Sequence, residues 1–376
     1  MGIPLEQERL AIIRLHLIDE IGPRRYKNLV AHFGSAQGAL AAEMSEIASV
    51  EGISSAVARK VSEAKNTLDV EKEIKDANNL GVEIITCVDD AYPESLINIH
   101  DAPVVIYVKG DISICNSLSV AVVGTRHPTA YGLSVARAIS RELAILGITT
   151  VSGLARGIDT EVHNVTLSAG GKTIAVLGNG LGKHYPPENR KLEDRIAACG
   201  AIVSEFSMDT GPDKGNFPRR NRLISGLALA TLVAEADEKS GALITAKYAL
   251  EQGKDVFAVP GPVFSKYSKG THLLIKQGAK LTESAQDIIE EIKPLEKILT
   301  KRAKTRFPVA DDAEEMEDTE EKIMQIIEVN FGGVSADRIS ALLKLEPAEI
   351  FSSLTTLEVK GYIRCLPGKT YIKNNR

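Results

Sequence analysis

The sequence predicts an α/β protein built on a doubly wound, mostly parallel sheet, with a helical domain before the sheet and a winged-helix domain after it. Three observations support this fold class. Apolar β-branched runs alternate with helical stretches between about residues 80 and 292, which is typical of a parallel sheet covered on both faces. Short helices with glycine turns precede this region, and a helix–helix–helix–hairpin pattern follows it.

Composition is that of an ordinary globular protein with two or three domains. The 376 residues are 44% hydrophobic and 25% charged, which provides enough apolar mass for a core. No apolar run is long enough to span a membrane, and the N-terminus lacks the pattern of a secretory signal. The four cysteines are scattered without metal-like spacing. We therefore expect reduced thiols in a cytoplasmic protein.

Local charge is more informative than the formal net charge of −5. The run "DDAEEMEDTEE" at residues 311–321 holds eight acids and no base, and the chain without it is net basic. Overall charge therefore does not exclude a polyanionic partner, and local basic segments decide the question.

The first segment, residues 1–75, is predicted to be helical. Two of its turns look alike, "LIDEIGPRR" around Gly22 and "SVEGISSAVARK" around Gly52, and a helix with basic residues follows each. This pattern resembles a pair of helix-hairpin-helix units, which can offer helix N-terminal N–H groups to phosphates. A plain helical packing domain fits the same pattern, so both interpretations stay open.

The second segment, residues 80–292, is the predicted sheet domain. In such sheets, ligands bind outside the carboxyl ends of the strands. Helical stretches expected between the strands include Gly132–Leu146, Pro187–Ala198 and Ala242–Gln252. The predicted strands are Val82–Thr86, Val104–Val108, Val120–Gly124, Ile148–Ser152, Thr173–Gly178, Ile202–Ser204, Thr231–Ala234, Asp255–Val259 and Ala279–Leu281.

A charged linker is expected at residues 293–318, followed by a winged-helix domain at residues 319–376. Ser335 has the position of an N-cap, Pro347 suits the first turn of the third helix, and "LPGKTY" is typical of a hairpin tip. Such a domain could enter a major groove or dock on a protein. Its acidic first helix and few basic residues leave both roles open.

Two glycine-rich stretches do not carry nucleotide-binding motifs. "SAGGKTIAV" lacks the first glycine of a P-loop, and a strand follows its lysine where a helix is required. "GNGLGKH", at Gly178–His184, follows a strand but lacks the dinucleotide spacing. We expect a tight loop beside a ligand groove there, and no cofactor.

Two other loops suit anion binding. "AVVGTRHPTAYG" places Gly124 to Arg126 after one predicted strand, and "SGLARGID" places Ser152 to Gly157 after the next. Glycine lets the backbone approach an anion, a following helix N-terminus adds a favourable dipole, and arginine supplies a bidentate donor. In the alternative interpretation the glycines serve tight turns and the arginines are solvated. Two such loops side by side favour a phosphate-binding rim.

Two further segments extend this prediction. "DKGNFPRRNRLISG", interpreted as a third loop, carries Lys214, Arg219, Arg220 and Arg222 around Phe217 and Asn221. Basic residues around an aromatic ring suit a flexible polynucleotide, although a buried Phe217 is the stronger alternative. Near Gly241, a strand-to-helix turn offers the hydroxyls of Ser240 and Thr245.

The sequence shows no evident catalytic or metal-binding group. Asp159 and His163 lie four residues apart on one helical face, a spacing that metal or acid–base sites use. No third ligand or nucleophile is near in the sequence. We expect a structural role for the pair, and a binding protein without catalytic residues or metal.

Several motifs in a fixed order closely resemble the DNA-processing protein A (DprA/Smf) family over roughly residues 80–292. They are "VAVVGTRHPTAYG", "VSGLARGIDTEVH", "TIAVLGNGL…YPPEN", "NFPRRNRLISGLA", "VAEADEKSGALITAKYALEQGKDVFAVPG" and "GTHLLIKQGA". The resemblance implies an extended Rossmann-like core, a helical N-terminal domain and a C-terminal winged helix. It also implies a homodimer that binds and protects incoming single-stranded DNA during natural transformation. Such a protein loads the RecA recombinase and displaces single-strand binding protein.

The predicted site combines the family motifs with the basic and hydroxyl-bearing segments; Lys183 is included without a motif of its own. The predicted single-stranded DNA or phosphate-binding residues are Gly124, Thr125, Arg126, Ser152, Gly153, Leu154, Arg156, Gly157, Lys183, Phe217, Arg219, Arg220, Asn221, Arg222, Ser240, Gly241 and Thr245.

Two rival functions come from other classes. Nucleoside-monophosphate phosphoribohydrolase-like enzymes share a Rossmann-like sheet and glycine loops, but "KSGALITAKYALEQG" replaces their glycine cluster and glutamate pair. A regulator that reads duplex DNA through the C-terminal domain is the second rival. The first remains the main alternative to a recombination mediator.

Overall fold

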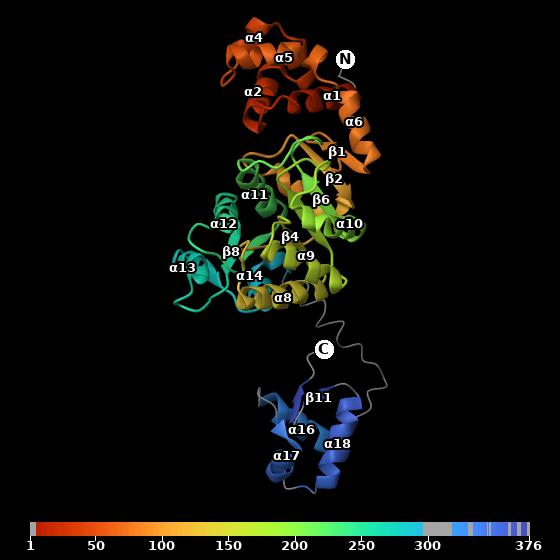
Figure 1. Cartoon of the computed structure of the whole chain (residues 1–376), viewed down its shortest axis with the longest axis vertical. Helices are drawn as coiled ribbons and strands as arrows, with labels where there is room; N and C mark the ends of the chain where they lie inside the picture. The colour runs from red at the N-terminus through yellow and green to blue at the C-terminus, as the bar shows by residue number, and fades with distance from the viewer. Residues whose placement is uncertain are drawn as a thin grey trace. The chain divides into compact units, whose positions relative to one another are not determined.

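The computed structural model describes residues 5–295, 318–329, 334–343, 345, 347–359, 362–366 and 370–373. The chain divides into two compact units, Met1–Arg302 and Ala303–Arg376, the first coloured red to cyan and the second blue in Figure 1. The predicted linker at residues 293–318 lies outside the described residues except at its ends. No described helix combines the length and the apolar character that crossing a bilayer requires.

The first unit begins with a helical domain, as the glycine turns predict. Ser54 and Asp69 accept hydrogen bonds from backbone N–H groups at the starts of α5 and α6, which are typical N-caps. Arg25 joins the two glycine turns, because its guanidinium donates to the carbonyl oxygens of Glu20 (2.7 Å) and Gly52 (2.9 Å). The helices are α1 (Leu5–His16), α2 (Pro23–Phe33), α3 (Ala36–Ala41), α4 (Met44–Ala48), α5 (Ser55–Thr67) and α6 (Val70–Asn79).

A nine-stranded, mostly parallel sheet follows, so the predicted fold class is confirmed. Its order is β1-β2-β6-β5-β4-β3-β7-β8-β9; β2 runs antiparallel to both β1 and β6, and the other pairs are parallel. Each predicted strand is present within two residues of its expected ends. The strands are β1 (Val82–Thr86), β2 (Val105–Gly110), β3 (Ser119–Val123), β4 (Thr149–Ser152), β5 (Thr173–Leu177), β6 (Ala201–Ser204), β7 (Ala230–Val233), β8 (Asp255–Ala258) and β9 (Lys280–Leu281).

The winding direction reverses beside β3. The chain passes from β3 through β4 and β5 to β6 on one side, then returns to β7 and β8 on the other side of β3. The loops after β3 and β7 therefore diverge to opposite faces and leave a crevice between them. Ligands of open α/β sheets bind at such a switch point.

Helices cover both faces of this sheet (Figure 1). On one face α8, α9 and α14 pack on the central strands, and on the other α11, α12 and α13 do so. The helices are α7 (Glu94–Ile97), α8 (Ala130–Ile145), α9 (Ile158–Ser168), α10 (Arg190–Cys199), α11 (Asn216–Leu227), α12 (Gly241–Glu251), α13 (Lys269–Lys276) and α14 (Ala285–Glu291), with short 3₁₀ turns at Ile112–Asn116, Pro187–Asn189 and Lys266–Ser268.

The interpretation of "DKGNFPRRNRLISG" as a loop is wrong, because most of it forms α11. Pro218 lies in the first turn, where its missing N–H has no intrahelical partner to lose. Leu223, Ile224 and Leu227 are buried against the sheet. The many basic residues of this segment made its apolar helical face hard to recognise in the sequence. Because the segment is a helix, its arginines point to different sides.

The helical domain and the sheet share one apolar core. Side chains of α1, including Ile12 and Leu15, belong to the same buried cluster as Val105 and Tyr107 of β2 and Ile202 of β6. About 25 cal/mol of stabilisation is expected for each Å² of apolar surface that such packing removes from water. The helical domain is therefore part of the folding unit of the sheet.

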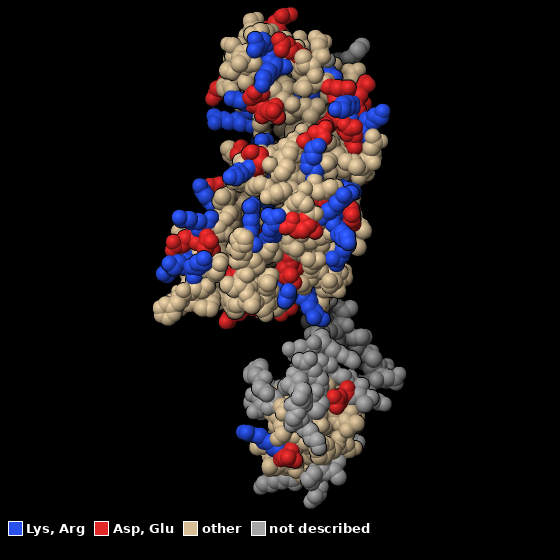
Figure 2. Space-filling model, in the orientation of Figure 1, with Lys and Arg blue, Asp and Glu red and all other residues tan. Residues whose placement is uncertain are grey.

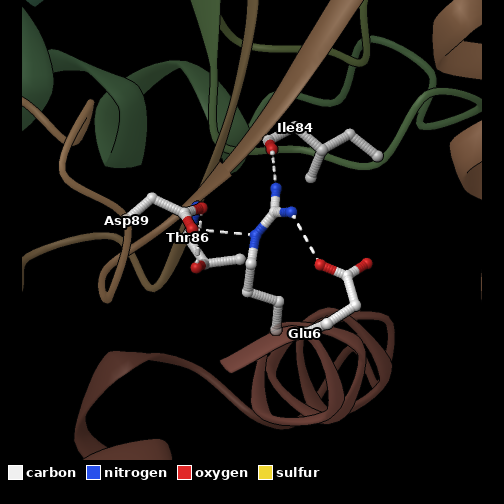
Figure 3. Close-up of polar contacts among 5 residues, drawn as sticks. Glu6, Ile84, Thr86 and Asp89 are labelled. Atoms are coloured by element: carbon white, nitrogen blue, oxygen red, sulfur yellow. Dashed lines mark hydrogen bonds and ion pairs between the residues drawn. The ribbon is translucent and has the colours of Figure 1, made fainter. Parts of the chain in front are cut away.

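A polar clamp reinforces this junction (Figure 3). Arg9 of α1 forms a 2.8 Å ion pair with Asp89 and donates to the carbonyl oxygen of Ile84 and to Glu6. Asp89 also accepts hydrogen bonds from the backbone N–H and the hydroxyl of Thr86. One carboxylate thus orients both the end of β1 and the helix that covers it.

The second unit is a winged-helix domain with its own core. Ser335 accepts a hydrogen bond from the N–H of Arg338, and Pro347 opens the third helix, as predicted. The predicted hairpin tip falls partly on undescribed residues 367–369. Its elements are α16 (Asp318–Val329), β10 (Val334–Ser335), α17 (Ala336–Leu343), α18 (Pro347–Val359), β11 (Ile363–Leu366) and β12 (Thr370–Lys373), and β12 is the central strand of three.

Lys254 caps the carboxyl end of α11. Its ammonium donates to the carbonyl oxygens of Ser225 (2.9 Å), Gly226 (2.6 Å) and Ala228 (2.7 Å). Burial lowers the pKa of Lys254 to about 8. The three carbonyl dipoles at the helix end favour the charged form, so the ammonium stays protonated at neutral pH.

We expect the Lys254→Met variant to lose about 2 kcal/mol or more in the free energy of unfolding, because several buried carbonyl groups lose their donor. Urea denaturation measures the loss. Lys247→Met is the matched control, since Lys247 is exposed and pairs with Glu251 within one helix. Equal stability of the two variants would contradict this capping role.

Candidate nucleic-acid interface

A groove of about 540 Å³ lies at the carboxyl ends of the central strands, and we name it the switch-point groove. It brings together the loop after β3, the start of α9, one face of α11 and the start of α12. The predicted residues that line it are Gly124, Thr125, Arg126, Phe217, Arg220, Asn221, Ser240, Gly241 and Thr245.

The loops after β3 and β4 touch each other closely. Gly157 has a φ of +81°, and a Cβ there would lie 2.5 Å from the carbonyl oxygen of Thr125. A Cβ on Gly153 would lie 2.8 Å from the guanidinium of Arg220 and from the carboxylate of Asp159. These two glycines are therefore required by loop packing, whereas the sequence suggested close approach to a ligand.

Arg220 is the buried cation beneath the loops, and 3% of it is exposed. It donates to the carbonyl oxygens of Gly153, at 2.7 Å, and of Val176. Burial lowers its pKa to about 10, and the nearby carboxylate of Asp159 opposes that shift. The guanidinium stays charged, and it ties α11 to the ends of β4 and β5.

Asp159 and His163 have the structural role that we expected. Asp159 accepts hydrogen bonds from the N–H groups of Gly153 (3.2 Å) and Ala155 (3.4 Å), and burial raises its pKa. His163 is bonded to the hydroxyl of Thr173 at 2.7 Å, and burial lowers its pKa to about 3. The two side chains thus serve different partners.

Ser152 and Leu154 also serve the loop rather than the groove. The hydroxyl of Ser152 is buried and donates to the carbonyl oxygen of Val122 at 2.8 Å. Leu154 is fully buried with a φ of +55°, and its carbonyl accepts from the side chain of Asn189. Neither side chain is free to meet a ligand.

The exposed rim of the groove combines a cation with aromatic rings. The guanidinium of Arg126 lies 5.3 Å from the ring centroid of Phe217, a cation–π distance. The ring of Tyr185 lies 5.4 Å from that of Phe217. Phe217 is half-buried against Gly178, where a Cβ would lie 2.7 Å from the ring. The ring is thus both partly packed and partly open to solvent.

Arg156 and Lys183 are placed differently. Arg156 lines a small pocket of about 20 Å³ beside the groove, together with Arg126, and its guanidinium pairs with Glu188. The loop residues Gly178 and Asn179 border this pocket, as the tight-loop interpretation expects. Lys183 lines neither cavity and pairs with Asp209 at 3.2 Å.

Arg219 and Arg222 face away from the switch-point groove. Both pair with Glu205 and line a separate groove of about 720 Å³ that is shared with the helical domain. Arg222 is 5% exposed and lies against that carboxylate. The expected convergence of Arg126, Arg156 and Arg222 on one rim is therefore wrong, because a helix turns residues 219 and 222 away from residues 217, 220 and 221.

The start of α12 completes the groove. Ser240 is the N-cap and accepts from the N–H of Ala242, while Gly241 is exposed. Asn221 donates to the carbonyl oxygen of Gly241 at 3.1 Å. Thr245 is almost fully buried. The hydroxyl of Ser240 is therefore partly engaged, and Gly241 offers open backbone.

Sequence reasoning missed His127, Tyr185 and Lys239, which also line the groove, and it left Lys214 out of the predicted site. Each of the four lies in a recognised loop motif, or within two residues of one or of Ser240. Their position in loops that follow strands was therefore the signal that could have identified them as groove residues. On the face shown in Figure 2, basic and acidic side chains alternate over the sheet domain.

Among the described residues, no three histidine, cysteine or acidic side chains gather as a metal site would need. The groove contributes a cation over an aromatic ring, open backbone and hydroxyls. This arrangement suits a ligand that carries both anionic groups and flat rings.

Comparisons with known proteins cover nearly the whole chain. The family model described as DNA recombination-mediator protein A matches residues 83–293. A helix-hairpin-helix domain model, described as DprA-like and N-terminal, matches residues 6–69. A DprA winged-helix model matches residues 308–369.

Individual relatives of the chain carry the names of the same family. The Smf protein of Synechocystis is 34% identical over 93% of this chain and 95% of its own length. The X-ray structure of DNA processing protein A from Streptococcus pneumoniae has a TM-score of 0.66 at 34% identity, covering 78% of this chain and 99% of that one. The same protein from Helicobacter pylori, whose structure was described for its single-stranded DNA binding mode, has a TM-score of 0.51 at 31% identity, covering 58% and 96%.

The position of Arg222 predicts a stability defect. We expect Arg222→Met to cost about 3 kcal/mol in the free energy of unfolding, because it leaves the buried Glu205 poorly compensated. The Glu205→Leu/Arg222→Met double variant should recover part of that loss. Chemical denaturation of both variants measures it.

Arg156→Met is the control for Arg222→Met, since its pair with Glu188 is exposed. It should leave stability unchanged, as exposed pairs contribute little. A wild-type free energy of unfolding for Arg222→Met would show that the buried pair contributes nothing.

Proposed function

Because this chain belongs to the DNA recombination-mediator protein A family, the DprA/Smf proteins, we propose that it binds single-stranded DNA as a recombination mediator and that the switch-point groove is the binding site. The observation that carries the proposal is the exposed Arg126 guanidinium over the Phe217 ring at the carboxyl ends of the strands. A single strand offers phosphates to the cation and bases to the ring.

Within the groove, the residues have different roles in this proposal. Arg126, Lys214 and Lys239 are the exposed cations that line it, and they attract the phosphates. Phe217 and Tyr185 offer ring faces to the bases. Arg220 acts indirectly, since it is buried and holds the loops in place. Sequence preference should be weak, because every base has a face that can stack.

We extend this proposal to the steps that the protein performs in the cell. The protein protects incoming single strands during natural transformation in the cytoplasm, displaces single-strand binding protein, loads the RecA recombinase, and acts as a homodimer. Support comes from the family description as a recombination mediator. A strand-exchange assay tests the loading step: the protein should restore RecA activity on DNA that is precoated with single-strand binding protein. Unchanged inhibition would refute it.

We expect Arg126→Ala to weaken binding to single-stranded DNA and to make the salt dependence shallower. For one lost phosphate contact, the slope of log K against log salt should fall by about 0.7. Fluorescence anisotropy titrations across a salt series measure both quantities. Phe217→Leu should weaken binding with an unchanged salt slope, because the lost contact is uncharged.

Lys75→Ala, an exposed cation on α6, is the control and should bind as the wild type does. If Arg126→Ala kept both the wild-type affinity and the wild-type slope, the switch-point groove would not be the binding site.

A further inference from the structure

A second basic and aromatic surface lies next to the switch-point groove, after β8. It consists of Phe264, Lys266, Tyr267 and Lys269, and we name it the outer patch. Phe264 is fully exposed, and Lys266 and Lys269 are exposed as well. The ammonium of Lys266 lies 4.8 Å from the ring centroid of Tyr267. The sequence prediction did not use this stretch, which lies between two of the family motifs.

Charge distinguishes this surface from the rest of the sheet domain. No aspartate or glutamate occurs between Asp255 and Glu283, whereas four lysines do. Within residues 5–295, neither Lys266 nor Lys269 forms an ion pair. Some exposed cations near the groove, such as Arg156 and Lys183, do have a carboxylate partner. The outer patch therefore keeps its full charge for a ligand.

The outer patch is joined to the groove by backbone hydrogen bonds. Ala236, directly beyond β7, donates to the carbonyl oxygen of Tyr267 at 3.0 Å and accepts from the N–H of Gly270 at 2.9 Å. The loop that continues from Ala236 carries Lys239, which lines the switch-point groove. Asp237 and Glu238 lie on the same loop, and the carboxylate of Asp237 accepts from the N–H of Lys239. The loop that carries Lys239 is thus bonded to the outer patch at Ala236 and lines the switch-point groove at Lys239.

We propose that the outer patch is a second section of the nucleic-acid track, in which a single strand leaving the switch-point groove passes Lys239 and stacks a base on Phe264. This inference rests on the proposed function and extends its footprint. Alternating rings and cations suit a single strand, since the rings accept bases and the lysines accept the phosphates between them. A fully exposed phenylalanine gains from such covering, because its apolar surface leaves water.

The test compares oligothymidylates of increasing length with the full chain. Short oligomers that fill the groove should bind wild type and Phe264→Ala equally. Longer ones should bind Phe264→Ala on the order of tenfold more weakly, which corresponds to one lost stacking contact. Oligomers with abasic sites in place of bases should not distinguish the two proteins. The Lys266→Gln/Lys269→Gln variant should instead show a shallower salt dependence on long oligomers.

Two matched controls are available. Leu250→Ala removes another exposed apolar side chain, on α12, and Lys75→Gln removes an exposed cation on α6. Both should bind oligomers of every length as the wild type does.

Three results separate the possibilities. Wild-type affinity of Phe264→Ala at all lengths would overturn the outer patch while leaving the groove intact. A loss on long oligomers that accompanies a lower mass by light scattering without DNA would also overturn it, since Phe264 would then contact a second copy of the chain. Failure of the wild type to bind any oligomer would instead overturn the proposed function.

Discussion

The arrangement of the site depends on one buried cation. Arg220 donates to carbonyl oxygens at the ends of β4 and β5, and its charge lies beside Asp159. Without a donor there, two strand ends would keep buried, unsatisfied carbonyl groups, and α11 would lose its register on the sheet. Because Asp159 in turn accepts from Gly153 and Ala155, the same pair fixes the loop after β4. The exposed side chains of the rim, such as Arg126, therefore stand on loops that Arg220 and Asp159 hold in place.

Helix α11 then divides the surface into two parts. Positions 217, 220 and 221 face the switch-point groove, and positions 219 and 222 face the groove beside the helical domain. Glu205 neutralises the second pair, whereas Arg126 lies over the Phe217 ring and forms no ion pair with the part of the chain that the structure describes. Five neighbouring residues of α11 thus have three roles: Arg220 supports the loops, Phe217 and Asn221 line the groove, and Arg219 and Arg222 pair with Glu205.

Strand positions and fold class could be predicted from sequence, because buried β-branched runs and glycine turns depend on local properties of the chain. The loops with Gly124 and Gly153 were also found for that reason. The direction of each arginine could not be predicted in the same way. A run such as "PRRNR" shows its charge but not its period, and interpretation as a loop treated Arg219, Arg220 and Arg222 as equivalent. Their partners, Glu205 and Gly153, come from distant strands, and only the packed sheet brings them near. Gly157 was predicted to allow close approach of a ligand, whereas its φ of +81° and its contact with Thr125 show that the packing of two loops requires a glycine there.

The apolar cluster shared by α1, β2 and β6 has a practical consequence. The sequence predicts a domain boundary near residue 80. Truncation at that boundary would separate Leu15 from Tyr107, two side chains that are fully buried in the intact chain. A fragment that begins at that boundary would expose an apolar surface that the intact chain buries, and we expect it to be poorly soluble for that reason alone. Truncations of this protein should therefore first remove the winged-helix domain, whose apolar core contains no residue of the sheet domain.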